Sequence, residues 1–233
     1  TAGHPYSLHK NHRDVEDRLI LTNKARYVGD AIAAVIAKDE IIAQKALKLI
    51  KVDYDILDAV FNTEDAIAEG APIIHEDKPN NIIASSKIEI GDINEEFKNA
   101  DYVFEGEYET SIVQHCQLEC QNAYAYVDEN NRIVIVTSTQ IPHIVRRIVG
   151  QALNIPIGRI RVIKPFVGGG FGNKQDVIIE PLTAAMTLAV NGRPVRLSLD
   201  REEVFASTRT RHAMKYKIRT AISKDGKLLA ISM

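Results

Sequence analysis

The sequence predicts an α+β protein, because strand patterns and amphipathic helical patterns alternate irregularly along a chain of ordinary globular composition. Of its 233 residues, 45% are hydrophobic and 26% are charged, and we see no repeat or low-complexity stretch. At roughly 100 to 200 residues per domain, this length suits one large domain or two small ones. The polar connector HEDKPNN suggests a boundary near residue 80, between a first part, 1–80, and a second part, 81–233.

The first part of the chain reads as a strand, a helix and a second strand. Residues 28–37 form a near-continuous run of small and branched apolar residues, which is typical of a strand buried on both faces. Asp39 is placed to cap a helix over 41–50, whose apolar residues recur at helical spacing. A second strand is predicted at 51–57, and a helical turn at 64–69.

In the second part of the chain, the predicted helices and strands follow one another more closely. Strands are predicted at 85–91, 103–110, 122–128, 133–138, 159–163, 195–199, 215–222 and 228–233, and helices at 92–100, at 142–153 and over about 177–191. Residues 129–131 are turn formers that predict a hairpin, and Pro142 fits the first turn of its helix. Pro181 either marks the first turn of the last helix or kinks it, and Gly192 lies past its end as a C-cap.

Charge and cysteine content exclude several function classes. Lys and Arg number 29 against 31 acidic residues, so no diffuse basic field favours nucleic acid or an anionic membrane. No apolar run approaches the ~20 residues of a spanning helix, and no secretory leader pattern opens the chain. Cys116 and Cys120 are too few for a secreted disulfide framework. We therefore expect a cytoplasmic protein.

The chain begins at Thr1 without an initiator Met and stops on an apolar run, so we expect both ends to be cut. Thr1 as a self-processed nucleophile is disfavoured, because the segment after it reads as a loop instead of a rigid strand. The histidines at 4, 9 and 12 form a loose cluster with few acidic partners. At most, adventitious metal binding is expected there.

The strongest local feature is KPFVGGGFGNKQD, residues 164–176, which lies between a predicted strand and a predicted helix. Glycine lets the backbone approach a ligand and take positive φ, so successive N–H groups can converge on an anion or an oxo group. The following helix start adds positive potential. A tight connection without a ligand is the alternative. Nucleotide motifs fail, since a Walker loop needs Gly before Lys174, and a dinucleotide pattern from Gly168 needs Gly in place of Asn173.

Two further segments carry chemistry. QHCQLEC, residues 114–120, gathers amides, a histidine, a carboxylate and both thiols. Strand alternation would put Cys116 and Cys120 on one face and Glu119 on the other, and we expect reduced, buried thiols. A metal site and the polar wall of a pocket are the alternatives, although neither face offers zinc its four ligands. Gln140 lies where a strand meets a helix, so its amide can bind a heterocycle or simply cap the junction.

These segments resemble the molybdenum-binding subunit of the xanthine dehydrogenase and aldehyde oxidase family of molybdenum hydroxylases. The match lies in QHCQLE, STQIPHIVRRIVGQALNIP, GGGFGNKQ and RPVRLSLDREEVFASTRTRH. VGDAIAAVIAKDEIIAQKALKLIKVDYD is similar to the family's α/β hammerhead domain. The resemblance covers nearly the whole chain. It implies the C-terminal portion of a truncated hammerhead domain over 1–80, followed by the first part of a molybdopterin-binding domain over 81–233.

The resemblance implies oxidative hydroxylation of a purine such as xanthine or hypoxanthine, a related N-heterocycle or an aldehyde, with oxygen from water. The family's molybdenum is held by a pterin, which in bacterial relatives is generally molybdopterin cytosine dinucleotide, and needs no protein ligand. Electrons pass to 2Fe-2S clusters and FAD. The residues implied to bind the cofactor are Gln140, Gly169, Gly170, Phe171 and Gly172. Gln175 stands where many xanthine-oxidising members carry the Glu that contacts the purine, which implies a substrate contact.

The chain departs from the family pattern in three ways. Val113, followed by Gln114, stands where the family often carries the Gln that reaches the oxo group. No residue here matches the family's catalytic Glu or substrate-binding Arg, so the fragment alone is expected to be inactive. No cysteine set for an iron–sulfur cluster and no flavin motif is present, which implies partner subunits and the rest of the molybdenum subunit. A non-catalytic fragment that keeps the fold or assists assembly is the second hypothesis, and a nucleotide-binding module using 168–172 is the third.

Overall fold

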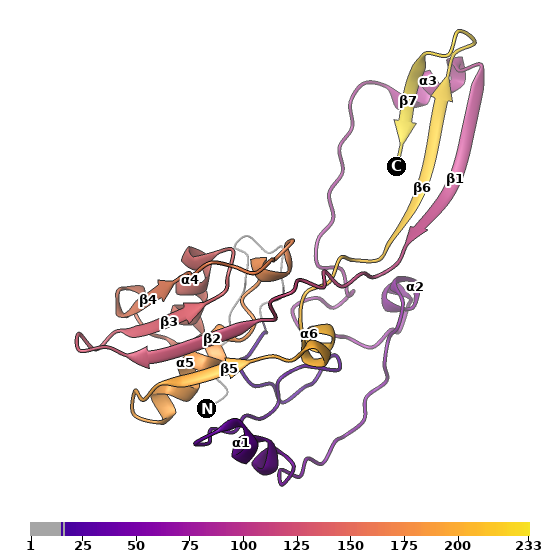
Figure 1. The fold of residues 1–233 in the computed structure, drawn as a ribbon. Coiled ribbons are helices and arrows are strands. Elements are labelled where there is room, and N and C mark those ends of the chain that lie inside the picture. The colour runs from indigo at the N-terminus through magenta and orange to yellow at the C-terminus, as the bar shows by residue number, and fades with distance from the viewer. Residues whose placement is uncertain (1–14, 16) are drawn as a thin grey trace. The chain divides into compact units, whose positions relative to one another are not determined.

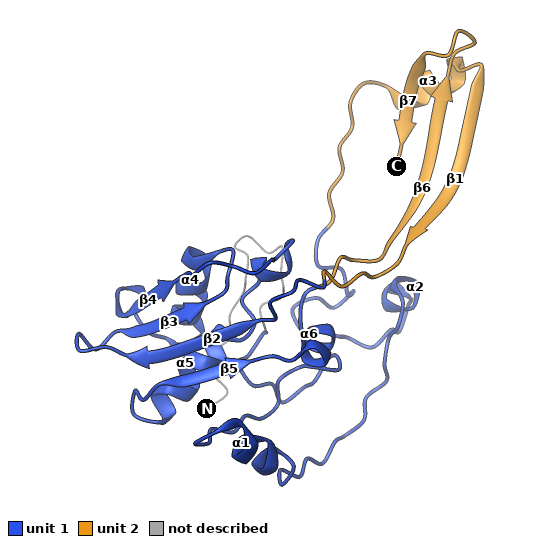
Figure 2. Cartoon of the chain, viewed as in Figure 1, with its two compact units in different colours: residues 1–84, 116–209 blue, residues 85–115, 210–233 orange. Residues whose placement is uncertain are grey.

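The computed structural model describes residue 15 and residues 17–233, which fall into two compact units (Figure 2). Unit 1 comprises residues 1–84 and 116–209, and unit 2 comprises residues 85–115 and 210–233. Each unit is therefore built from two separate stretches of chain. Thr1 and the histidines at 4, 9 and 12 lie outside the described residues.

Helices and strands are interspersed, which confirms the α+β class (Figure 1). The helices are α1 (Glu40–Leu47), α2 (Thr63–Ile67), α3 (Ile93–Asn99), α4 (Pro142–Leu153), α5 (Glu180–Ala189) and α6 (Arg201–Ser207), and the strands are β1 (Tyr102–Thr110), β2 (Asn122–Val127), β3 (Ile133–Thr137), β4 (Ile160–Ile163), β5 (Val195–Ser198), β6 (Met214–Ile222) and β7 (Leu228–Ser232). Every helix in the described part of the chain is too short or too polar to cross a membrane.

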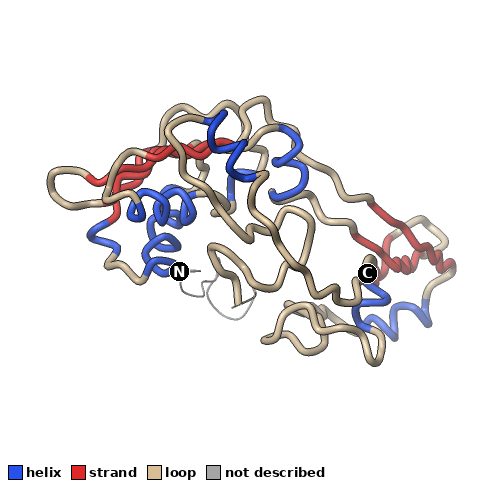
Figure 3. Tube along the Cα trace, turned by 90° about the horizontal axis from the view of Figure 1, so that it is seen from below, coloured by secondary structure: helices blue, strands red, loops and turns tan. Residues whose placement is uncertain are grey.

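The core of unit 1 is a four-stranded sheet in the order β4-β3-β2-β5. β2 pairs antiparallel with β3 and with β5, whereas β3 and β4 are parallel and are joined by the crossover helix α4. Helices α4 and α5 contact each other and the sheet, and Figure 3 shows helix lying beneath the strands of this unit. The buried core is made of Ala125, Ile133, Ile135, Val145, Ile148, Val149, Ala152, Ile160, Val177 and Ala184, among others. Burial of this apolar surface is the main force that holds unit 1 together.

Local sequence explains the ends of the unit 1 helices. Pro142 occupies the first turn of α4, and Asn154 ends that helix in the left-handed conformation that an Asn C-cap tolerates. Pro181 lies in the first turn of α5 and does not kink it. Helix α6 was not predicted, although Asp200 and Glu203 form a capping box that is visible in the sequence DREE.

Unit 2 is a three-stranded antiparallel sheet in the order β1-β6-β7, with α3 packed against β7. Opposite charges face each other across the long β1 and β6 strands: Glu105 opposes Arg219, Glu107 opposes Lys217 and Glu109 opposes Lys215. Each such exposed pair contributes about 1 kcal/mol or less. The register is therefore fixed by many weak cross-strand pairs, together with the Arg219 guanidinium, which lies 4.5 Å from the centre of the Phe97 ring.

Three predicted strands are absent. Residues 28–37, 51–57 and 85–91 are assigned to no strand in the described part of the chain. Many of their apolar side chains are exposed, including Val28 at 88%, Ile56 at 90% and Ile88 at 85%. A strand needs a neighbouring strand to receive its backbone hydrogen bonds, and periodicity alone does not supply one. The helices between these segments form as expected, because a helix satisfies its hydrogen bonds internally.

Glu180 is a buried acid at the start of α5, held between β3 and its own helix. Its carboxylate accepts hydrogen bonds from the Thr137 hydroxyl at 2.9 Å and from the Ile178 N–H at 3.0 Å. Burial raises the pKa of the Glu180 carboxyl, and these hydrogen bonds only partly oppose that effect. The ionised form is therefore a cost to the folded state.

We predict that Ile148→Ala lowers the free energy of unfolding by about 2–5 kcal/mol, because Ile148 is fully buried between α4 and the sheet. Ile144→Ala on the same helix is the matched control, since Ile144 is 37% exposed. Urea unfolding followed by far-UV circular dichroism measures both. Equal shifts in the two variants would show that α4 does not pack as described.

We predict that Glu180→Gln stabilises the protein increasingly as the pH rises. A carboxyl whose pKa is raised by folding binds its proton more tightly in the folded state, so wild-type stability falls as the pH climbs above the unfolded value of about 4.3. Gln carries no charge. Its carbonyl oxygen can accept from the Ile178 N–H, and its NH2 can donate to the Thr137 hydroxyl, which can then donate to the Asn122 carbonyl. The measurement is the difference in Tm between variant and wild type from pH 4 to pH 8. Glu202→Gln, the same change on the exposed face of α6, should give a flat difference.

Candidate functional site

Parallel pairing of β3 and β4 brings two chain turns to the same end of the unit 1 sheet. The strands run side by side with Val136 opposite Ile163, so both leave the sheet at neighbouring points. Gln140 follows β3, and the glycine-rich segment 164–176 follows β4. In open sheets, ligands bind beyond the carboxyl ends of the strands. The topology thus puts the strongest sequence motif where a ligand site is expected.

The glycine loop, residues 168–172, has an irregular backbone. Its φ angles are 94° at Gly169, 51° at Phe171 and 95° at Gly172, all in the left-handed region. Glycine takes these angles at little cost, whereas a non-glycine residue such as Phe171 is strained by roughly 1–3 kcal/mol. The Phe171 side chain is 73% exposed, so core packing does not compensate. Contacts around the loop must therefore impose its shape.

The central N–H groups of the glycine loop have no hydrogen-bond partner among the described residues. Among the described residues, no hydrogen-bond acceptor is found for the N–H groups of Gly169, Gly170 and Phe171. Gly170 is buried, and buried N–H groups nearly always have a partner. Three consecutive unused donors therefore suit an acceptor from outside the chain.

Gln140 supports this loop directly. Its Oε1 accepts a hydrogen bond from the Gly172 N–H at 3.2 Å, and its own N–H donates to the Lys174 carbonyl at 2.9 Å. A Cβ added at Gly170 would lie 2.5 Å from Gln140 Oε1, so only glycine permits this approach. The structure therefore brings Gln140 together with the predicted loop residues, while their role in cofactor binding stays a prediction.

Glu119 binds the first residue of the loop and Lys174, which lies two residues beyond the loop's last residue. One carboxylate oxygen, Oε2, accepts from the Gly168 N–H at 2.8 Å and from Lys174 Nζ at 2.6 Å. Burial pushes the pKa of the Glu119 carboxyl up, but hydrogen bonds from Lys174, Gly168 and Asn122 outweigh it, so the pKa lies below its usual value. Glu119 is thus ionised and opposite a lysine side chain that is only 1% exposed.

A buried amide cluster secures the C-terminal end of the loop. Gln117 Nε2 lies 3.3 Å from both Gln121 Oε1 and Asn173 Oδ1, and Gln121 also donates to Asn173. Asn173 Nδ2 in turn donates to the Arg209 carbonyl at 2.6 Å. Among the described residues, Gln117 Oε1 has no partner. This network fixes Asn173, the residue immediately after the loop.

Gln175, the predicted substrate residue, lies at the end of a short 3-10 helix, Asn173–Gln175. Its N–H donates to the Gly172 carbonyl at 3.1 Å, which ties it to the loop, and its side chain is exposed. The structure therefore leaves the amide accessible to a small molecule.

The predictions for the cysteine segment are wrong in two respects. Residues 116–120 are not part of a strand, and Cys116 has a φ of 53°. The thiols are not buried either, because Cys116 is exposed and Cys120 is half-buried, and both are free. The segment instead turns Gln117 inward and leaves the sulfur atoms outside, since the amide finds polar partners there. Gln114 belongs to unit 2.

The metal-ligating groups in the described residues do not include this segment. The cluster found there is Asp17, His75 and Asp77. Asp17 already accepts from Arg26 and contacts His75 Nδ1 at 2.7 Å, so its carboxylate is engaged. No metal site is indicated among Cys116, Cys120 and Glu119.

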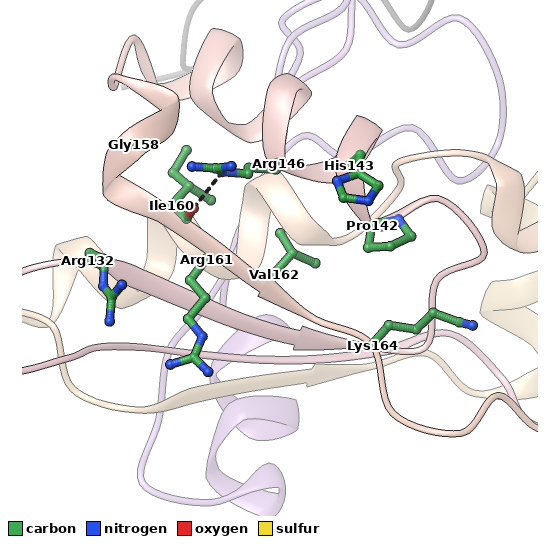
Figure 4. Close-up of a pocket in the computed structure, with 9 residues that line it drawn as sticks. All are labelled: Arg132, Pro142, His143, Arg146, Gly158, Ile160, Arg161, Val162 and Lys164. Atoms are coloured by element: carbon green, nitrogen blue, oxygen red, sulfur yellow. Dashed lines mark hydrogen bonds between the residues drawn. The ribbon is translucent and has the colours of Figure 1, made fainter.

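A cavity of about 420 Å³ opens between the start of α4 and β4 (Figure 4). Its walls are Arg132, Pro142, His143, Arg146, Gly158, Ile160, Arg161, Val162 and Lys164, and Arg146 Nε donates to the Ile160 carbonyl at 2.9 Å. None of the predicted site residues lines it. Exposure varies along the glycine loop: Gly168 and Phe171 are exposed, whereas Gly170 is buried.

Sequence reasoning missed Glu119, Lys174 and Asn173 as parts of the site. Glu119 was placed on a strand face, and Lys174 was considered only as a failed nucleotide motif. The signal available was that both residues lie within the family-like segments QHCQLE and GGGFGNKQ. Their contact joins positions that are 55 residues apart, which no local pattern reveals.

Comparisons with known proteins identify the family of this chain. The family model for a molybdopterin cofactor-binding domain matches residues 74–233, and the model for the aldehyde oxidase and xanthine dehydrogenase a/b hammerhead domain matches residues 2–58. The chain is 46% identical over 233 residues to a putative xanthine dehydrogenase molybdenum-binding subunit of Escherichia coli K12, covering all of this chain and 31% of that protein. It is 34% identical to the nicotinate dehydrogenase large molybdopterin subunit of Eubacterium barkeri, covering 94% and 51% of the two chains.

Solved structures show the same fold. The aldehyde oxidoreductase of Desulfovibrio desulfuricans superposes with a TM-score of 0.92 at 27% identity, covering 99% of this chain and 26% of that one. Quinoline 2-oxidoreductase of Pseudomonas putida 86 gives a TM-score of 0.86 at 28% identity, covering 99% and 30%. This chain spans only about a third of the length of the E. coli relative, and a similar or smaller share of each solved structure. Because the cofactor-domain model covers most of its length, this chain belongs to the xanthine dehydrogenase and aldehyde oxidase family of molybdopterin-binding proteins.

Proposed function

We propose that this chain is part of the molybdenum subunit of a hydroxylase that inserts oxygen from water into a purine such as xanthine or hypoxanthine, a related N-heterocycle or an aldehyde. The observation that carries the proposal is the row of unused N–H donors at Gly169, Gly170 and Phe171, held open by Gln140. The relatives named xanthine dehydrogenase and nicotinate dehydrogenase support this reaction class.

The residues present fit a molybdenum–pterin cofactor, and two features of this structure support that fit. The three open amides are donors for the acceptor atoms of such a group. A Cβ at Gly170 would meet Gln140 Oε1 at 2.5 Å, so glycine is needed there for the Gln140 amide to pack against the loop and order it. In the proposed assignment Gly169, Gly170, Phe171 and Gly172 line the cofactor. When bound, the cofactor supplies the two-electron oxidation of the substrate carbon.

This chain's own residues would bind the cofactor and position the substrate. Gln140 accepts a hydrogen bond from the Gly172 N–H, and the N–H groups of residues 169–171 would face the cofactor. Gln175 would hydrogen-bond a ring oxygen or nitrogen of the substrate, since an amide both donates and accepts but carries no charge. Proton abstraction needs a base, and no catalytic residue is assigned to this chain.

The rest of the assembly is proposed by analogy with the family. The cofactor would be molybdopterin cytosine dinucleotide, and 2Fe-2S clusters and FAD would sit on partner subunits. The remaining part of the molybdenum subunit would supply the base, and the location would be the cytoplasm. We keep the domain boundary near residue 80, between a hammerhead portion and the cofactor-binding portion.

The deciding experiment is metal and nucleotide analysis of the full-length subunit purified with its partners. Molybdenum and cytidine nucleotide in equal, near-stoichiometric amounts would support the enzyme. Their complete absence would favour a scaffold that only keeps the fold. Binding of ATP or NAD by residues 1–233 alone would favour a nucleotide-binding module, and we expect none.

We predict that Gly172→Val lowers molybdenum content at least about tenfold, because a β-branched residue at φ 95° is strongly strained and reshapes the loop. Gly158→Val is the control, since a Cβ at Gly158 would meet no atom within 4 Å. Metal content per protein, measured beside Tm, separates loss of cofactor from loss of fold. Normal loading of the Gly172 variant would refute the assigned role of the loop.

We predict that Gln175→Ala raises KM for xanthine about 2- to 10-fold, the worth of one hydrogen bond, with a smaller effect on kcat. An aldehyde without ring acceptors should show no such change. Gln151→Ala, an exposed amide on α4, is the matched control. An equal loss with both substrates would remove Gln175 from the substrate contacts.

A further inference from the structure

We propose that Glu119 is a positioning residue for the glycine loop: a single carboxylate oxygen, shared between the Gly168 amide and the Lys174 ammonium, ties the start of the loop to the segment that follows it. This proposal rests on the function proposed above, because an ordered loop matters only if the loop binds the cofactor. It adds a residue that lies outside the loop and outside the substrate contacts.

The first step is the geometry of the shared oxygen. Glu119 Oε2 accepts from the Gly168 N–H at 2.8 Å and from Lys174 Nζ at 2.6 Å, so it joins the loop's first residue to the segment that follows the loop. The Glu119 N–H also donates to the Gly168 carbonyl at 3.1 Å. Glu119 Oε1 accepts from Asn122 Nδ2 at 3.2 Å, which fixes the carboxylate plane. The Asn122 contact therefore orients the Glu119 carboxylate independently of its contacts to the loop.

The second step is that the contacts close a ring. Lys174, whose ammonium meets Glu119, accepts the Gln140 N–H at its carbonyl at 2.9 Å. Gln140 then accepts the Gly172 N–H at 3.2 Å. A path thus runs from Glu119 through Lys174 and Gln140 back into the loop. A shift of the carboxylate moves both the start of the loop and the residue that supports its far end.

The third step is electrostatic. The Lys174 side chain is 1% exposed, and that of Glu119 is 29% exposed. An ammonium buried to that extent needs a counter-charge, and among the described residues Glu119 is the carboxylate within ion-pair distance. Removing the charge therefore frees Lys174 to seek water, which pulls on residues 172–174.

The fourth step is steric. A Cβ added at Gly168 would lie 2.6 Å from Glu119 Cβ, so only glycine lets the loop lie this close to the Glu119 side chain. The strained conformation at Phe171 persists only if its neighbours over-determine it. Glu119 supplies that constraint on one side, as Gln140 does on the other. An ion pair that only stabilised the fold would not need the additional hydrogen bond from the Gly168 N–H to the same oxygen.

The test uses the full-length molybdenum subunit in its holoenzyme. Glu119→Gln keeps an acceptor for Gly168 but removes the charge that faces Lys174, and Glu119→Asp keeps the charge but shortens the reach. Asp128→Asn is the matched control, because Asp128 forms an ion pair with Arg132 at 2.9 Å elsewhere in unit 1. The readouts are amide hydrogen exchange of the peptide covering 168–174, the paramagnetic resonance spectrum of the molybdenum centre, and Tm.

We expect exchange in the 168–174 peptide to rise at least about tenfold in Glu119→Gln, less in Glu119→Asp, and not at all in Asp128→Asn. The resonance spectrum should change in the two Glu119 variants alone, while Tm falls more in Glu119→Gln, which leaves a buried ammonium unpaired, than in Asp128→Asn. Unchanged exchange and an unchanged spectrum, with only a lower Tm, would overturn the proposal and leave an ordinary ion pair.

Two further outcomes are informative. If Glu119→Gln fails to fold, the double variant Glu119→Gln with Lys174→Met removes the unpaired ammonium, and faster loop exchange in it supports the proposal while unchanged exchange overturns it. If the wild-type protein carries no molybdenum, the proposed function fails. The exchange measurement still decides on its own whether Glu119 orders the loop.

Discussion

The parallel pairing of β3 with β4 is the constraint on which the candidate site depends. Because the two strands point the same way, the turn after β3 and the loop after β4 emerge together, and Gln140 reaches the Gly172 amide. An antiparallel pairing would send them to opposite ends of the sheet. Helix α4 makes the parallel crossover possible, since its buried stripe packs into the core while it carries the chain back across the sheet.

The loop itself is a backbone feature held by side chains from elsewhere. Gly169 and Gly172 allow the left-handed turns, yet glycine alone gives freedom and not a shape. The shape comes from Gln140, Glu119 and the buried amides around Asn173, which are contributed by segments far from the loop in sequence. Gln140 and the cluster around Asn173 order the loop through uncharged amides, and the one carboxylate among these groups, Glu119, is balanced by Lys174.

Local patterns predicted most helices correctly, the β2–β3 hairpin, and also strands such as β1 and β6 that pair over more than a hundred residues of sequence. Helix α1, helix α4 and the β2–β3 hairpin all lie within a few residues of their expected positions. The failures are the strands predicted at 28–37, 51–57 and 85–91, which pair with no neighbouring strand among the described residues. An apolar run predicts a tendency to be buried, whereas a strand also requires a partner edge.

By itself, the sequence determined the class of the fold, the glycine loop as the centre of interest, and the family, because motifs and periodicity are local and survive in a linear reading. Only the tertiary structure decided that Glu119 and Lys174 meet, that the thiols of Cys116 and Cys120 stay outside the core, and which loop amides remain open. These depend on contacts between residues far apart in the chain. Whether a side chain is buried or an amide is satisfied is set by what folds against it, and one segment's pattern does not contain that information.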